Sequence, residues 1–197
     1  ILDYFSQVFL TKTALPSFLQ QKSGRIVFVS SVAGLLGTQY RASYSAAKAA
    51  IHLWANSLRA EVAEQGVDVS VIFPGFVKTN VSINALNGEG KAQGYDNEAT
   101  ANGLEADEFA KITVNALLKG EEYIVVGGRK EVLGTWVSRL SPSTLYKMIR
   151  KMKVKWFFDL TFIKLNIKWN DAYLNLSVMR YATTLGIKFC TTFYQLE

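Results

Sequence analysis

Apolar residues recur along the chain with two different periods, which predict an alternation of helices and strands. Residues 4–21, 44–64 and 104–119 carry apolar side chains at helical spacing. Between and after them, residues 25–29, 67–73 and 123–126 are β-branched and aromatic runs, typical of strands buried on both faces of a parallel sheet. Because a helix that joins two such strands forms a βαβ unit, the pattern predicts an open α/β sheet.

Glycine and proline residues mark where these elements end or bend. Pro16 is expected to bend the first helix, which ends near Gly24. Gly66 is expected to cap the C-terminus of the second helix, and Gly120 to end the third. Residues 84–103 are rich in glycine and asparagine, so we expect a loop or short helices that lie over a site.

Composition narrows the classes of protein to which the chain can belong. A length of 197 residues with 49% hydrophobic content is enough for one domain with a sizeable core. The net charge of +6 is concentrated late in the chain, and no zinc-finger spacing or RNA-recognition aromatic signature accompanies it, which argues against nucleic-acid binding. The single Cys190 excludes an internal disulfide, and the single His52 excludes a multi-histidine metal site and Ser-His-Asp catalysis. No metal site is expected.

The two ends of the chain differ from its middle. The sequence opens on Ile1 without a methionine or a signal region, and we interpret it as truncated. No stretch of about 18 uninterrupted apolar residues predicts a membrane-spanning helix. Residues 156–197 hold ten of the 25 aromatic residues without a clear period, which fits either sequence outside the fold or an interfacial membrane segment.

Candidate chemistry gathers where two predicted neighbouring strands end. Ser31 follows the strand at 25–29, and Pro74 and Gly75 follow the strand at 67–73. Tyr44 and Lys48 lie one helical turn apart on the helix that joins those strands, so they share one helix face. Ligands of an open parallel sheet bind beyond the carboxyl ends of its strands, and these residues are expected to face one crevice.

A hydroxyl, a phenol and an ammonium in one crevice suit the reduction of a carbonyl or the oxidation of an alcohol. The ammonium of Lys48 favours the phenolate form of Tyr44, which can then act as a general acid or base. The Ser31 hydroxyl can donate to a substrate oxygen on which negative charge builds. The simpler alternative is that Ser31 caps a strand end and that Tyr44 and Lys48 lie on a helix surface without a catalytic role.

These residues resemble the short-chain dehydrogenase/reductase superfamily, and three motifs occur in its order and at its spacing. Residues 74–84, 94–96 and 100–101 further resemble the dehydrogenase/reductase member-seven group. The resemblance implies a partial Rossmann-like, doubly wound parallel sheet over residues 1–155, the C-terminal part of that fold, with the segment 156–197 outside it. In that family a Gly-rich phosphate-binding turn precedes these motifs, whereas the first glycine of this chain is Gly24. The motifs span residues 24–34, 44–48 and 74–79.

By resemblance the chain is an NAD(P)-dependent oxidoreductase, with NADP favoured over NAD, that transfers a hydride between nicotinamide and an alcohol or ketone. The family roles are substrate orientation for Ser31, proton transfer for Tyr44 and ribose binding for Lys48. The residues that the resemblance places on the cofactor are Tyr44, Lys48, Pro74, Gly75, Val77 and Thr79.

Two of these positions carry an open question. A threonine after a Pro-Gly turn is also a common helix N-cap, so Thr79 serves as a cap, as a cofactor contact or as both. Asp3 stands where the family has an asparagine that supports a proton relay. A carboxylate accepts hydrogen bonds only, so it cannot copy an amide that donates and accepts.

The resemblance also bears on partners and location. It implies a small-molecule alcohol or ketone as substrate and allows a homodimer through the helix that carries Tyr44. It implies an intracellular protein, and the member-seven group allows association with the endoplasmic reticulum membrane. The alternative is a catalytically inactive fragment or an interaction module, because a sheet that lacks its first strands exposes an edge and apolar surface.

Overall fold

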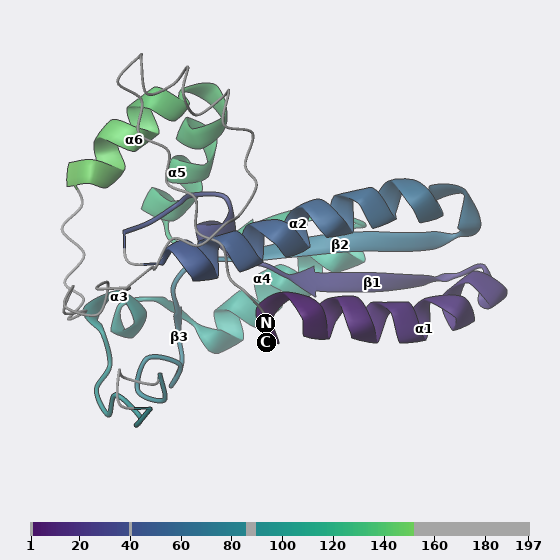
Figure 1. Ribbon diagram of the computed structural model, residues 1–197, viewed down its shortest axis with the longest axis horizontal. Helices are drawn as coiled ribbons and strands as arrows, with labels where there is room; N and C mark the ends of the chain where they lie inside the picture. Colours follow the sequence, from purple (N-terminus) through teal and green to yellow (C-terminus); the bar gives the residue numbers. More distant parts are fainter. Residues whose placement is uncertain (1, 40, 86–89, 152–197) are drawn as a thin grey trace, which may run out of the picture. The chain divides into compact units, whose positions relative to one another are not determined.

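The described residues fold around a three-stranded parallel sheet (Figure 1). The structure is a computed structural model that describes residues 2–39, 41–85 and 90–151, so the segment 156–197 and the predicted boundary at 155 lie outside the described residues. The strands are β1 (Gly24–Val29), β2 (Val67–Pro74) and β5 (Tyr123–Val126), in the order β1-β2-β5. Gly24 lies opposite Val67, and Ile72 lies opposite Ile124. The predicted α/β class with a partial Rossmann-like sheet is confirmed.

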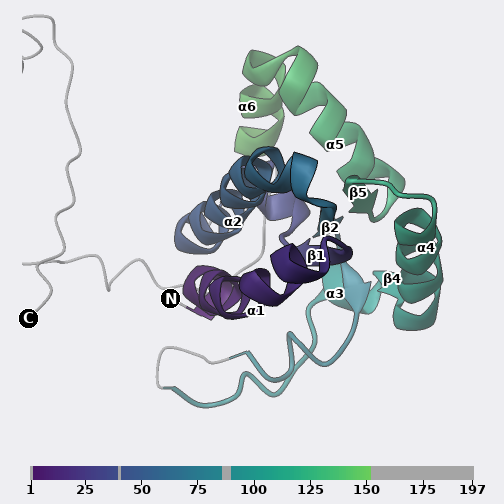
Figure 2. The ribbon, with the colours of Figure 1, turned by 90° about the vertical axis from the view of Figure 1, so that its right-hand side faces the viewer.

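Helices cover both faces of this sheet. Figure 2 shows α1 (Gln7–Gln21) and α2 (Ala42–Val62) on one side of the strands and α4 (Ala106–Leu118) on the other. Among the described residues, no helix is both long enough and apolar enough to cross a membrane. The remaining elements are the π-helical turn η1 (Leu2–Ser6), the 3-10 turns η2 (Val32–Gly34) and η3 (Ala63–Gln65), the short strands β3 (Val77–Lys78) and β4 (Leu104–Glu105), and the helices α3 (Glu98–Ala101), α5 (Arg129–Leu140) and α6 (Pro142–Lys151).

The three predicted strands and the three long helices are present, with differences at their ends. The first helix opens as η1 and then continues through Pro16 as α1 without a break. The third begins two residues later than expected, because Leu104 and Glu105 pair with β3. The described part of the segment 84–103, residues 84–85 and 90–103, contains the single-turn helix α3, in line with the expected loop or short helices.

Strand β2 is the best-buried element and carries cores on both of its faces. Val69, Val71 and Phe73 are completely buried on the α2 side, where Ile51 and Ala55 of α2 are also fully buried. On the other side Ile72 packs with Ile124, Val126 and Ala116 of β5 and α4. A strand in this position has no solvated face, which explains its nearly continuous apolar sequence.

Strand β1 is less buried than the sequence indicates. We expected burial on both faces, but only Phe28 is fully buried, and Val27 and Val29 are 37% and 47% exposed. Val29 lies in register with Ile72, on the face that α4 covers over β2 and β5. Because β1 is the edge strand of the described sheet, α4 does not reach it, and its outward valines meet solvent.

The only histidine of the chain, His52, is half-buried between aromatic rings. Its ring centre lies 4.9 Å from that of Phe73 and 5.9 Å from that of Tyr123, both edge-on. Burial lowers the pKa of His52 below its ordinary value near 6.5, and the positive charges of Arg139 and Arg59 lower it further. The native state therefore prefers the neutral imidazole.

This preference makes stability depend on pH. Because the folded-state pKa of His52 is the lower one, the unfolded chain binds the proton first as the pH falls, and native stability decreases below about pH 6.5. We expect the melting temperature of the chain to fall between pH 7.5 and 5.5, and to fall less for His52→Gln, as measured by circular dichroism. Equal slopes for the two proteins would contradict the assignment, since no other histidine titrates in this window.

Candidate active site

The end of β1 is joined to α2 by a buried serine. The Ser30 hydroxyl donates to the backbone carbonyl of Lys48 over 2.8 Å, and the Ser30 amide donates to Ile72 of β2 over 2.9 Å. Ser30 is 2% exposed. These two bonds fix the backbone of α2 at Lys48 against the carboxyl edge of the sheet, which is a structural role.

The next residue, Ser31, faces the end of the neighbouring strand. Its hydroxyl accepts a hydrogen bond from the Ala33 amide over 3.1 Å, which caps η2, and donates to the Pro74 carbonyl over 3.4 Å. Ser31 and Pro74 thus meet at the carboxyl edge, as the sequence predicts. A donor–acceptor distance of 3.4 Å is long, so this second bond is weak and easily exchanged for another acceptor.

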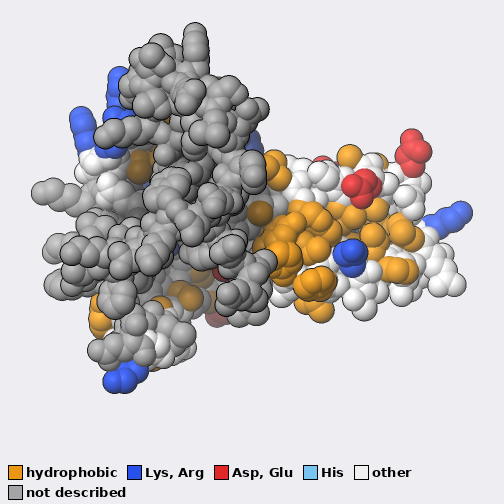
Figure 3. All heavy atoms as spheres, viewed as in Figure 1, with side chains coloured by type: hydrophobic (Ala, Val, Ile, Leu, Met, Phe, Trp, Pro, Cys, Tyr) orange, Lys and Arg blue, Asp and Glu red, His pale blue; other side chains and the backbone are white. Residues whose placement is uncertain are grey.

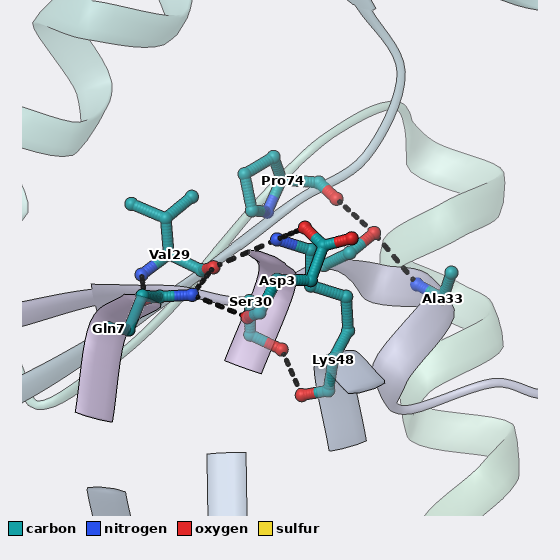
Figure 4. Close-up of polar contacts among 8 residues, drawn as sticks. Asp3, Gln7, Val29, Ser30, Ala33, Lys48 and Pro74 are labelled. Carbon is teal, nitrogen blue, oxygen red and sulfur yellow. Dashed lines mark hydrogen bonds and ion pairs between the residues drawn. The ribbon is translucent and has the colours of Figure 1, made fainter. Parts of the chain in front are cut away.

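Lys48 brings a cation to the same edge. Its side chain is only 11% exposed, and its Nζ lies 2.9 Å from Asp3 Oδ1 and 3.3 Å from the Val29 carbonyl oxygen. A buried ammonium must be paired, because its desolvation is otherwise very costly. Figure 4 shows Asp3 and Lys48 reaching toward each other over the end of β1.

Tyr44 joins this group through Lys48. The Lys48 Nζ lies 5.7 Å from the centre of the Tyr44 ring, the separation expected for residues four apart on one helix. Tyr44 is 37% exposed, so a ligand can reach its ring. Ser31 and Lys48 therefore lie at the carboxyl edge of the sheet, with the Tyr44 ring beside the ammonium and Asp3 as an additional charged member.

The turn after β2 is held by a residue that the sequence analysis missed. Glu131, near the start of α5, accepts hydrogen bonds from the amides of Phe76, over 3.3 Å, and Gly128. Gly75 donates its own amide to the Val126 carbonyl over 2.8 Å. The sequence feature that could have predicted this role is the position of Glu131 three residues after Gly128, which is the spacing of a helix-capping carboxylate.

Val77 and Thr79 lie further along the same segment. Val77 pairs with Leu104 in the small β3–β4 sheet. Thr79 is exposed, and its hydroxyl accepts from the Val81 amide over 3.4 Å, which stabilises a turn. Of the two roles expected for Thr79, this local contact resembles the cap, although it lies in a turn and not at the start of an α-helix.

The sequence matches proteins of known family. A family model described as short chain dehydrogenase matches residues 2–90. The Drosophila melanogaster protein "Dehydrogenase/reductase SDR family protein 7-like" is 39% identical over 155 residues, which cover 79% of this chain and 48% of that protein. The Xenopus laevis "Dehydrogenase/reductase SDR family member 7B" is 32% identical over 170 residues, 84% of this chain and 53% of that protein. The chain belongs to the short-chain dehydrogenase/reductase family.

Solved structures of short-chain dehydrogenases share this fold. A Burkholderia cenocepacia enzyme, solved in complex with NADP, superposes with a TM-score of 0.62 at 20% identity, over 75% of this chain and 56% of the other. A Streptomyces avermitilis enzyme gives 0.53 at 26% identity, over 76% and 60%. The chain spans about half the length of the curated short-chain dehydrogenase/reductase relatives it matches.

The close approach at Gly75 generates a prediction for this member of the short-chain dehydrogenase/reductase family. A Cβ at Gly75 would lie 2.7 Å from Glu131 Oε2 and 3.0 Å from the Gly127 backbone, and the backbone cannot yield as a flexible side chain would. We expect Gly75→Ala to lower the free energy of unfolding by about 1–3 kcal/mol in urea denaturation. Gly37→Ala is the matched control, because a Cβ there meets nothing within 4 Å. Equal effects at both positions would contradict the proposed crowding.

Proposed function

We propose that this chain carries the catalytic residues of an NAD(P)-dependent oxidoreductase that interconverts an alcohol and a ketone. The observation that carries the proposal is the buried ammonium of Lys48, 5.7 Å from the centre of the Tyr44 ring at the strand edge where Ser31 meets Pro74. Membership of the short-chain dehydrogenase/reductase family supports it. Because the chain spans about half of its relatives, the activity is proposed for the protein in which these residues act.

Each of the three side chains has a distinct task in this proposal. The Ser31 hydroxyl exchanges its weak bond with the Pro74 carbonyl for a bond to the substrate oxygen, and so orients the carbon that reacts. The Tyr44 hydroxyl gives its proton to that oxygen during reduction, or takes it during oxidation. The Lys48 ammonium stabilises the negative charge that remains on the Tyr44 oxygen.

The donor set at the strand edge fits a nicotinamide cofactor. The N–H groups of Lys48 are the donors at this edge, and a ribose hydroxyl would have to share this ammonium with Asp3 and the Val29 carbonyl. With Tyr44, Lys48 would hold the ribose, and the turn formed by Pro74, Gly75, Val77 and Thr79 would lie along the nicotinamide. When bound, the cofactor supplies or accepts the hydride. We favour NADP, the cofactor named for the Burkholderia cenocepacia structure.

The alternative function is that of an inactive fragment or interaction module. It is supported by the half-length match and by the place of β1 at the edge of the described sheet, where the side chains of Val27 and Val29 are exposed. The two functions differ in what the 197-residue chain does with a cofactor. We expect the chain by itself to bind NADPH or NADH weakly, whereas an interaction module binds neither.

Removal of the Tyr44 hydroxyl tests the catalytic proposal. General acid–base groups contribute about 100-fold or more, so we expect Tyr44→Phe to lower kcat for ketone reduction at least 100-fold while the melting temperature is kept. The assay uses NADPH oxidation with a panel of ketones, on the chain and on a chimera that adds the unmatched part of the Drosophila relative.

Tyr146→Phe, the same change at an exposed position of α6, is the matched control and should leave kcat unchanged. Retained turnover in Tyr44→Phe would refute the proton-transfer role. An inactive chimera that folds and shows no cofactor binding would favour the interaction module.

The faces of α1 and α2 support the proposed homodimer. Apolar side chains gather over these two helices in Figure 3, and Phe9 and Leu53 are 63% and 65% exposed. Burial of such a patch against a second copy is favourable by about 25 cal/mol per Å². We expect the chain to elute as a dimer in size-exclusion chromatography with light scattering, and Leu53→Glu to elute as a monomer. Leu118→Glu on α4 is the control, and a monomeric parent chain would contradict the pairing.

A further inference from the structure

A carboxylate lies against the cation of the proposed site. Asp3 Oδ1 is 2.9 Å from Lys48 Nζ, and the Asp3 side chain is 45% exposed while that of Lys48 is 11% exposed. The pair therefore sits at the boundary between the protein interior and solvent, with the lysine on the inner side. An ion pair in this position is screened by solvent less than one on the open surface.

The position of Asp3 is fixed by its neighbours. The Gln7 amide group donates to the Asp3 backbone carbonyl over 2.9 Å and to the Val29 carbonyl over 3.3 Å, and its oxygen accepts from the Val29 amide over 3.2 Å. One side chain thus ties the turn η1 to the end of β1, as Figure 4 shows. The Asp3 carboxylate is held over the strand end before any ligand arrives.

The Val29 carbonyl completes the arrangement. It accepts from Lys48 over 3.3 Å, so the ammonium is drawn from two sides toward the end of β1. A hydrogen bond between two charged groups is roughly twice as strong as one between neutral groups. A neutral ribose hydroxyl offers Lys48 a weaker partner than Asp3 does, and the two compete for the same cation.

We propose that Asp3 is a positioning residue that holds the Lys48 ammonium against the end of β1 and competes with the cofactor's ribose for it. The inference rests on the proposed function, because it concerns the same lysine and the same cofactor. It gives the acidic residue at this position a role that differs from a proton relay. Asp3 lowers cofactor affinity and keeps the buried cation paired while the site is empty.

The test compares variants that keep shape and change charge. Asp3→Asn removes the charge, Asp3→Glu keeps it, and Asp107→Asn makes the same change at an exposed position of α4. The first readout is the ¹⁵N–¹H NMR signal of the Lys48 ammonium, identified by its loss in Lys48→Met. Its protons exchange slowly with water only while they are hydrogen-bonded. We expect the signal in the parent chain, in Asp3→Glu and in Asp107→Asn, and its loss in Asp3→Asn.

The second readout is NADPH affinity, measured by chemical-shift titration to millimolar concentration. Loss of one charge-assisted competitor should tighten binding about tenfold in Asp3→Asn, and leave it unchanged in Asp107→Asn. The inference about Asp3 is overturned, without harm to the proposed function, if the Lys48 signal persists in Asp3→Asn. It is likewise overturned if the NADPH affinity of Asp3→Asn is equal to or below that of the parent chain. If no folded variant binds NADPH, the proposed cofactor role of Lys48 is refuted. The proposed competition between Asp3 and the ribose is then refuted as well, even if the Lys48 NMR signal is lost in Asp3→Asn as expected.

Discussion

The burial of one ammonium group governs the arrangement of the candidate site. Lys48 sits on a helix that is packed against a fully apolar stretch of β2, so its Nζ must find polar partners within reach of that packing. It finds the Asp3 carboxylate and the Val29 carbonyl. The turn η1, the end of β1 and the first turns of α2 therefore meet at this cation, with the Tyr44 ring beside it, and the bonds of Gln7 and Ser30 join the same elements.

The apolar core and the polar edge depend on each other. Strand β2 is covered by α2 on one face and by α4 on the other, which leaves its carboxyl end as the place where backbone groups emerge from the core. Ser30 and Glu131 satisfy such groups near this edge, the first by a bond to the Lys48 carbonyl and the second by bonds to the amides of Phe76 and Gly128. Because the Lys48 carbonyl belongs to α2 and Glu131 to α5, the packing of these helices bears on the geometry of the edge where the proposed cofactor would lie.

Sequence periodicity was sufficient for the elements that form the core and insufficient elsewhere. The strands and the helices at 44–64 and 104–119 follow from apolar spacing, since burial selects their residues directly. Helices α5 and α6 were missed, because burial selects few of their residues: Gly134 and Thr135 in α5 and Leu145 in α6. The exposure of Val27 and Val29 was also missed. Their apolar side chains predict burial under a neighbouring helix, but none of the described elements covers them. The pairing of Asp3 with Lys48 joins residues 45 positions apart, so no local pattern could reveal it.

The open edge of β1 bears on the choice between an enzyme and an interaction module. In parallel pairing alternate residues direct both backbone groups to one side, and Ser30 faces β2, so Val29 faces outward. An outward residue of an edge strand normally presents an unpaired amide and carbonyl to a new partner. At Val29 the Gln7 side chain pairs with both groups, as a neighbouring strand would, and Lys48 adds a second bond to the carbonyl. The carboxyl end of β1 is thereby completed from within the described chain, at the very position where the site residues meet. An exposed edge along the rest of β1 is therefore compatible with the paired Lys48 ammonium on which the proposed site depends, so the open edge by itself does not argue for the interaction module.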